Sequence, residues 1–155
     1  MKQAFEILKA TRKNYLKAID GLSLKELNTI PEGFNNNIIW NVTHTVVTQQ
    51  LLCYGRTGNR IRLSDEIVND YRKGSKPQRP VTQAEVAQSI KWLTESIEWI
   101  EADYDNGLFI DYNTYPTSYG YTLMSIEDAI NFNNVHEGLH LGWIGAIKKS
   151  LGSKW

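Results

Sequence analysis

Apolar residues recur along four segments of the chain at alternating steps of three and four positions, the spacing of one face of an α-helix. These segments cover residues 3–20, 37–56, 82–104 and 125–151, with bounds that are approximate. Little of the period-two alternation typical of strands lies between them. The pattern therefore predicts an all-α protein, a four-helix bundle.

Local signals mark where several of these helices begin. Ser23 with Glu26, and Thr82 with Glu85, form capping boxes, in which side chain and backbone at a helix start bond to each other. The first box predicts a short turn of helix, and the second predicts the start of the third long helix. Ser125 is the expected N-cap of the fourth helix.

Glycine and proline punctuate two long connections. Residues 55–80 include a candidate short helix at 64–71, and residues 106–124 are rich in tyrosine and glycine and contain a candidate short hairpin. Connections of this length favour crossovers rather than simple hairpins between neighbouring helices. No internal repeat divides the chain, and residues 1–155 are expected to form a single domain.

The charge balance narrows the range of partners. Lys and Arg number 17 and Asp and Glu number 17, so no overall field favours nucleic acid or an anionic membrane. The first residues mix charged with apolar side chains, so we expect neither a signal peptide nor a membrane-spanning segment. Cys53, the only cysteine, excludes an internal disulfide and is expected to be buried and structural. These features predict a cytoplasmic protein.

All three histidines of the chain fall on predicted helices. His136 and His140 are four positions apart, which places both rings on one side of the fourth helix, one turn from each other. His44 lies on the second helix. The histidines share their faces with apolar neighbours, namely Trp40, Val47 and Leu51 on the second helix and Ala129, Phe132, Leu139, Trp143 and Ile147 on the fourth. We therefore expect all three rings to point toward the core.

Buried imidazoles need partners, because an unpaired polar group in an apolar interior costs roughly 1–3 kcal/mol. One shared cation would satisfy all three rings; the alternative is that each ring bonds to a nearby carbonyl. Three histidine ligands leave one position of a tetrahedral ion open to water or substrate, as in catalytic sites. The sequence thus predicts a divalent transition metal at His44, His136 and His140, with zinc, nickel and iron all suited to imidazole ligands.

The stretch from His136 to His140 also matches H-E-x-x-H, in which zinc proteases use the glutamate as general base. The residues that follow His140 include no histidine or carboxylate to serve as a third ligand, so a protease is the less favoured interpretation. Glu137 is the one catalytic candidate. Its alternative roles are to flank the ion, to orient a ligand or simply to pair with a neighbouring side chain.

Three stretches of the sequence resemble the DinB-like superfamily, which includes bacterial S-transferases that use low-molecular-weight thiols. They are residues 38–44 (IIWNVTH), 70–77 (DYRKGSKP) and 136–143 (HEGLHLGW). The resemblance implies a four-helix bundle, a metal site at the three histidines and a homodimer. Characterised relatives activate a thiol at the metal, and the resemblance implies the same chemistry as one possibility for this chain. Thr43 is a departure, since many relatives have glycine at this position.

Two functional interpretations follow from the residues and the resemblance. In the first, the chain is a metal-dependent thiol S-transferase or hydrolase that acts on a small electrophile, with a low-molecular-weight thiol as candidate cosubstrate. In the second, it is a non-enzymatic, stress-related metal-binding bundle. Neither interpretation involves nucleic acid, for which the composition offers no basic surface.

Further features outside the histidines allow alternative interpretations. Residues 55–80 carry a net charge of +4, which suits either an anionic thiol or a solvated loop. The tyrosines of the second connection form either a lid over a substrate pocket or a cover on the end of the bundle; they are Tyr112, Tyr115, Tyr119 and Tyr121. Gly138, Gly142 and Gly145 line another side of the fourth helix, where a neighbouring helix is expected to approach closely.

Overall fold

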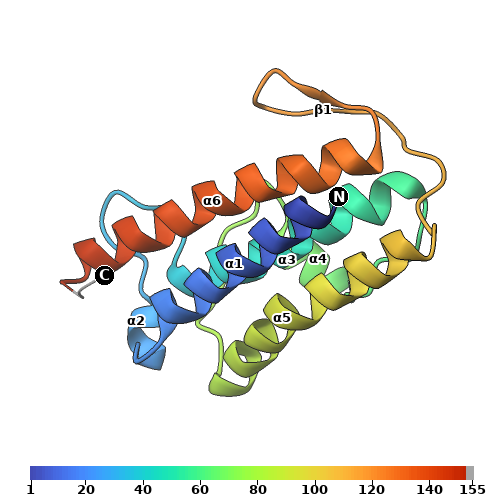
Figure 1. Cartoon of the computed structure of the whole chain (residues 1–155). Helices are drawn as coiled ribbons and strands as arrows, with labels where there is room; N and C mark the ends of the chain where they lie inside the picture. The colour runs from blue at the N-terminus through green and yellow to red at the C-terminus, as the bar shows by residue number, and fades with distance from the viewer. Residues whose placement is uncertain (153–155) are drawn as a thin grey trace.

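The computed structural model of the chain describes residues 1–152 and contains four long helices packed lengthwise (Figure 1). They are α1 (Lys2–Ile19), α3 (Ile38–Cys53), α5 (Gln83–Asp105) and α6 (Ile126–Ser150). Every long helix begins within one residue of its predicted start, and the largest error at an end is three residues, in α3. The structure confirms the predicted all-α four-helix bundle.

Short elements occupy the connections, and all of them except the 3₁₀ helix are predicted from the sequence. They are α2 (Leu24–Asn28), the 3₁₀ helix η1 (Gly55–Thr57), α4 (Asp65–Tyr71) and the strands β1 (Tyr115–Pro116) and β2 (Thr122–Leu123). The two strands pair antiparallel and form the expected hairpin. Both capping boxes are present at Ser23 and Thr82, and the side chain of Asn37, which the sequence analysis did not single out, caps α3.

The long helices form a ring in the order α1, α6, α3, α5, because α6 and α5 each pack chiefly against α1 and α3. Hydrogen bonds join Asn134 to the Ala4 carbonyl and Lys148 to the Ala18 carbonyl, so α1 and α6 run in the same direction. Hydrogen bonds from Thr43 to Ser89 and from Tyr54 to Asp103 show that α3 and α5 are also parallel to each other. The shared apolar clusters place α3 antiparallel to α6.

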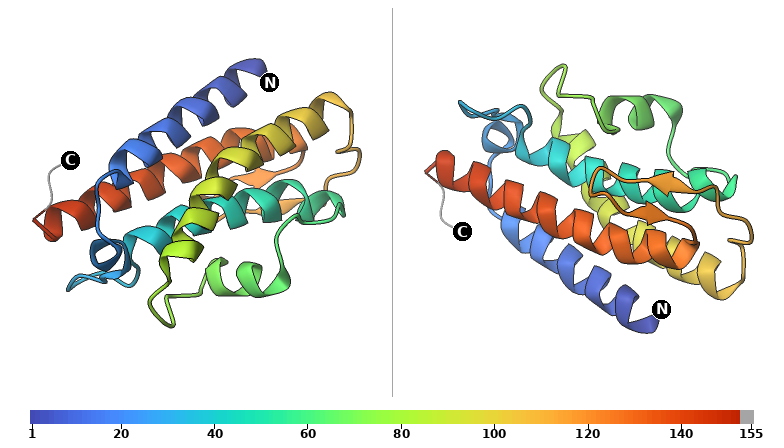
Figure 2. Two further views of the ribbon diagram at one scale, coloured as in Figure 1. Left: turned by 90° about the horizontal axis from the view of Figure 1, so that it is seen from below. Right: turned by 90° about the horizontal axis from the view of Figure 1, so that it is seen from above.

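The first long connection is a crossover, as predicted, whereas the second joins the antiparallel helices α5 and α6 at one end of the bundle, where Tyr104 bonds to Glu127. Residues 54–82 join the parallel helices α3 and α5 and carry α4 along the outside of the bundle. Residues 106–125 lead from α5 to its diagonal partner α6, and their hairpin lies over α3 and α6 (Figure 2). The two connections therefore approach α3 and α6, the helices that carry the histidines.

The core consists of two apolar clusters with a buried polar layer between them. One cluster includes Tyr15, Val46, Leu93 and Ile144, and the other includes Phe5, Leu52, Ile97 and Ile130. The buried polar residues that lie between the clusters along the four helices are Arg12, Thr45, Gln49, Ser96, Asn133 and Glu137. At the centre of this layer, Arg12 and Glu137 form an ion pair in which both side chains are almost fully buried.

The buried face of α6 differs from the face that the hydrophobic pattern indicated. Leu139 and Trp143, expected on the core side, are 42% and 48% exposed, whereas the core stripe passes through Glu137. The reason is the ion pair: a buried carboxylate must meet its cation, so α6 turns Glu137 toward α1. Leu139 and Trp143 then lie on the opposite side of the helix, at the surface.

The expected close approach of a neighbouring helix is absent at two of the three glycines of α6. A β-carbon placed at Gly138 or Gly142 would meet no atom within 4 Å among the described residues. The surface around these two glycines is therefore open in the single chain, and the homodimer stays a prediction.

Cys53 is buried in the second apolar cluster, as predicted for a structural residue. Burial raises the pKa of its thiol well above the usual value, which keeps the group protonated. Among the described residues, no helix is both long enough and apolar enough to cross a membrane.

The central ion pair gives a direct test of what holds α6 in place. Replacing Glu137 by Gln leaves the Arg12 charge buried without its counterion, so we expect the free energy of unfolding to fall by about 3–5 kcal/mol. Urea denaturation followed by circular dichroism measures this change. The matched control is Lys9→Met. Lys9 lies on α1, as Arg12 does, and forms an ion pair with Glu101 nearer the surface. Equal effects of the two substitutions would contradict a central role for the buried pair.

Candidate metal centre

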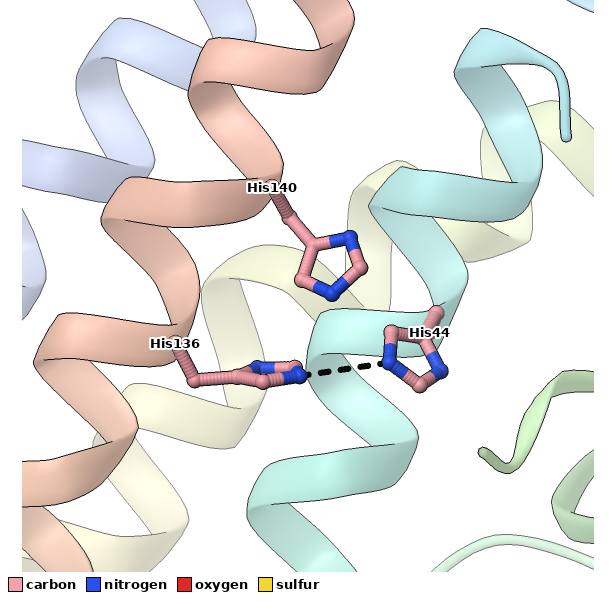
Figure 3. A group of neighbouring side chains, drawn as sticks. All are labelled: His44, His136 and His140. Carbon is pink, nitrogen blue, oxygen red and sulfur yellow. Dashed lines mark hydrogen bonds between the residues drawn. The ribbon is translucent and has the colours of Figure 1, made fainter. Parts of the chain in front are cut away.

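The three histidines meet in the space between α3 and α6 (Figure 3). His44 projects from the middle of α3, and His136 and His140 project from successive turns of α6. One nitrogen from each ring lies within 4.8 Å of the others. The structure thus brings together all three residues that the sequence singled out as ligands.

Two of the rings are oriented by hydrogen bonds on the side away from the cluster. The Nδ1 of His44 lies 2.6 Å from the carbonyl oxygen of Tyr71, the last residue of α4. A carbonyl only accepts, so Nδ1 carries the hydrogen and Nε2 keeps a lone pair. The Nδ1 of His140 lies 2.8 Å from Oδ1 of Asn41. Asn41 donates its own Nδ2 to the Asn37 carbonyl, which leaves Oδ1 to accept from His140.

The third ring, His136, shows why a cation fits this site. Its Nε2 is 3.2 Å from the Nε2 of His44, which already carries a lone pair, and its buried Nδ1 has no hydrogen-bond partner among the described residues. His136 Nδ1 lacks a partner among the described residues whether Nε2 donates to His44 or binds an ion, so the case for a cation rests on the ring nitrogens that face one another. A cation would accept a lone pair from each of these nitrogens. Ligand nitrogens around a tetrahedral zinc ion lie about 3.4 Å apart, close to the 3.2 Å that separates the Nε2 atoms of His44 and His136, and all three ligand atoms lie within 4.8 Å of one another.

The surroundings keep the three rings neutral, the form that binds metal. Burial is the largest cause and lowers the pKa of His136 to about 2 and that of His140 to about 3. Burial also lowers the pKa of His44, partly offset by its bond to the Tyr71 carbonyl. A lowered pKa disfavours the protonated ring, so protons do not compete for the lone pairs near neutral pH.

Two further residues of α3 contact the cluster. The Trp40 indole stacks on the His44 ring, with centroids 4.5 Å apart and planes 12° from parallel. The hydroxyl oxygen of Thr48 lies 3.3 Å from His44 Nε2 and therefore faces the same point as the ligand atoms. Sequence reasoning missed Asn41, Thr48 and Tyr71 as parts of the site. A signal for Asn41 and Thr48 was available, since both are polar residues within about one turn of His44 on the same helix.

Glu137 lies on the core side of α6, about 100° around the helix from His136. Its two carboxylate oxygens accept from Nε and Nη2 of Arg12 at 2.6 and 2.7 Å, and Oε1 also accepts from Asn133 at 2.7 Å. Pairing with a neighbour, one of the roles weighed for Glu137, is therefore the role that the structure shows. With both oxygens engaged by Arg12, the carboxylate is not free to serve as a general base.

The histidines line a cavity of about 720 Å³ between α3, α6, the loop that follows α4 and the hairpin. Its other lining side chains include Leu51, Leu52, Arg56, Lys73, Lys76, Tyr115, Tyr119, Phe132 and Leu139. Of the four tyrosines of the second connection, Tyr115 and Tyr119 contribute to this wall. Tyr112 packs against the second apolar cluster, and Tyr121 is exposed. The hairpin therefore contributes both to a pocket wall and to the cover of the bundle.

Comparisons with known proteins bear on the fold and the family of the chain. Among solved structures, the chain is similar to YfiT from Bacillus subtilis, described as a probable metal-dependent hydrolase with an unusual four-helix bundle topology. The TM-score is 0.54 at 16% identity, over 99% of this chain and 88% of that chain, and this likeness shows the fold alone. No curated protein matches the chain. The family model of the DinB superfamily matches residues 7–144, and the chain therefore belongs to that superfamily.

Proposed function

We propose that His44, His136 and His140 hold one divalent transition-metal ion, and that the cavity they line is the active site of a metal-dependent enzyme. The observation that carries this proposal is the convergence of one ring nitrogen from each of the three histidines at the wall of a cavity of about 720 Å³. An ion with a purely structural role is normally closed off by four protein ligands. Three ligands beside an open cavity favour catalysis over the non-enzymatic alternative.

A divalent ion at this site would act as a Lewis acid and would lower the pKa of a water or thiol nucleophile toward neutrality. The chain supplies the orientation: the Tyr71 carbonyl and the Asn41 amide fix two of the rings. The Thr48 hydroxyl is placed to bond a nucleophile or leaving group at the same point.

The reaction we propose is attack on a small electrophile, with either water or a low-molecular-weight thiol as the nucleophile. Hydrolysis is supported by the description of YfiT as a probable metal-dependent hydrolase. Thiol transfer is supported by the resemblance to S-transferases of the superfamily. The two reactions differ only in the nucleophile, so one site with an open position accommodates either.

Elemental analysis of protein purified without a chelator or histidine tag tests the metal site. We expect about one transition-metal ion per chain, and its loss in both His44→Ala and His140→Ala, because two imidazoles hold such an ion far more weakly than three. Tyr119→Phe, which changes the cavity wall but no ligand, is the matched control and should keep the metal. Full metal content in the histidine variants would refute the site.

A turnover assay with the zinc-loaded protein separates the enzymatic from the non-enzymatic interpretation. We expect hydrolysis of p-nitrophenyl acetate, or thiol-dependent consumption of 1-chloro-2,4-dinitrobenzene, followed by absorbance. Either activity should disappear with a chelator and in His44→Ala, since the nucleophile depends on the ion. Stoichiometric metal without either activity would favour the metal-binding bundle instead.

The bond from His140 to Asn41 predicts a measurable effect on metal affinity. Asn41→Ala removes the acceptor for His140 Nδ1, so the zinc dissociation constant should rise by about 10- to 100-fold. Competition with a chromophoric chelator measures the constant. Asn41→Asp keeps an acceptor oxygen at the same position and should retain tight binding. Equal affinity in the Ala and Asp variants would show that Asn41 does not orient the ligand.

A further inference from the structure

We propose that the cavity binds an elongated anion, with its acidic group at Arg56, its apolar body along the wall between α3 and α6, and its reacting end at the three histidines. The proposal rests on the proposed function in taking the histidines as the reacting end. It adds the class of substrate: a molecule with a carboxylate, sulfonate or phosphate at one end and an apolar or aromatic body.

The length of the cavity follows from the positions of its lining residues along α3, the helix that forms one side of it. His44 and Arg56 both line the cavity, and they are separated by about three turns of α3 and η1, on the order of 18 Å. On the antiparallel helix α6, Phe132 lies one turn before His136, toward the Arg56 end. The cavity thus extends from the metal ligands to Arg56, which suits an extended ligand better than a compact one.

The wall between these two ends is largely apolar. Leu51 and Leu52 from α3, Phe132 from α6 and Tyr115 from the hairpin supply its apolar surface, and Leu139 adds an apolar side chain at the histidine end. Burial of apolar surface against this wall contributes roughly 25 cal/mol per Å². A fully polar ligand would leave these side chains without a matching surface, so the body of the ligand should be apolar or aromatic.

Arg56 is a half-buried cation whose position is fixed by the hairpin. Its guanidinium carbon lies 4.3 Å from the centre of the Tyr115 ring. Stacking on one face leaves the N–H groups at the edge of the guanidinium free to bind an acidic group with two bonds. No carboxylate lies within ion-pair distance of Arg56 in the described part of the chain, whereas Arg62 and Arg79 of the same connection pair with Asp103 and Glu85.

The electrostatics of the whole cavity favour an anion. None of its lining residues is an Asp or Glu, and Lys73 and Lys76 add two further cations on the side of the loop after α4. These lysines are exposed, and flexible exposed ammonium groups contribute more to attraction at a distance than to a fixed bond. Arg56 is therefore the group that selects the acidic end.

Calorimetric titration with a matched pair of probes tests this assignment. The probes are 6-phenylhexanoate and the neutral 6-phenylhexan-1-ol, which share an apolar body and differ in the charge of one end. We expect the carboxylate to bind at least tenfold more tightly than the alcohol. The substitution Arg56→Gln should reduce the affinity for the carboxylate to that for the alcohol. Equal affinities of the wild-type protein for the two probes, or binding of neither, would overturn the proposal.

The control for general charge effects is Arg60→Gln, because Arg60 is exposed in the same connection but does not line the cavity. It should preserve the preference for the carboxylate, and an equal loss in both variants would show a diffuse charge effect and overturn the proposal. An equal loss of affinity for both probes in Arg56→Gln would show that Arg56 only shapes the wall through Tyr115, and this result would also overturn the proposal.

The outcome can be separated from that of the metal proposal. The titrations are carried out with metal-free protein and with zinc-loaded protein, and the metal content is measured independently. Loss of the preference for the carboxylate leaves the metal stoichiometry unchanged. Failure to bind metal leaves the Arg56-dependent preference in the metal-free protein intact.

Discussion

The buried ion pair between Arg12 and Glu137 determines how α6 is oriented in the bundle. Two charges in the interior are tolerated only when they meet with good geometry, and here the guanidinium binds both carboxylate oxygens. Arg12 also donates to the Leu93 carbonyl of α5, so the pair ties α1, α5 and α6 together. With Glu137 turned inward, the histidines on either side of it in sequence are turned toward α3. A buried ion pair that is costly to break therefore sets the direction of two of the three ligands.

The third ligand is oriented by a different part of the chain. His44 is held between the Trp40 ring, which stacks on it, and the carbonyl at the end of α4. The site thus combines rigid helices, which supply the ligands, with connections that supply the surrounding wall. This division suits a catalytic centre, because the metal geometry is fixed by the bundle while the recognition of a ligand depends on side chains from the loops.

The sequence was sufficient to predict the helices, the capping boxes, the hairpin and the meeting of the three histidines, because each depends on local periodicity or on residue chemistry. The rotation of α6 was not predictable in this way. Leu139 and Trp143 made one face look like the core, and only the partner Arg12, distant in sequence, reveals that Glu137 belongs there. The stacking of Arg56 on Tyr115 is likewise a long-range contact that no local pattern records.

The hydrogen bond between His44 and the Tyr71 carbonyl couples the binding of a metal ion to the binding of a ligand in the cavity. The loop that follows Tyr71 carries Lys73 and Lys76 into the cavity wall, so this backbone is shared by the ligand-binding cavity and the metal ligand. Any molecule that displaces the loop on entering also alters the hydrogen bond that orients the imidazole. By thermodynamic linkage, occupancy of the cavity and affinity for the ion must then influence each other by the same factor, in whichever order the two bind.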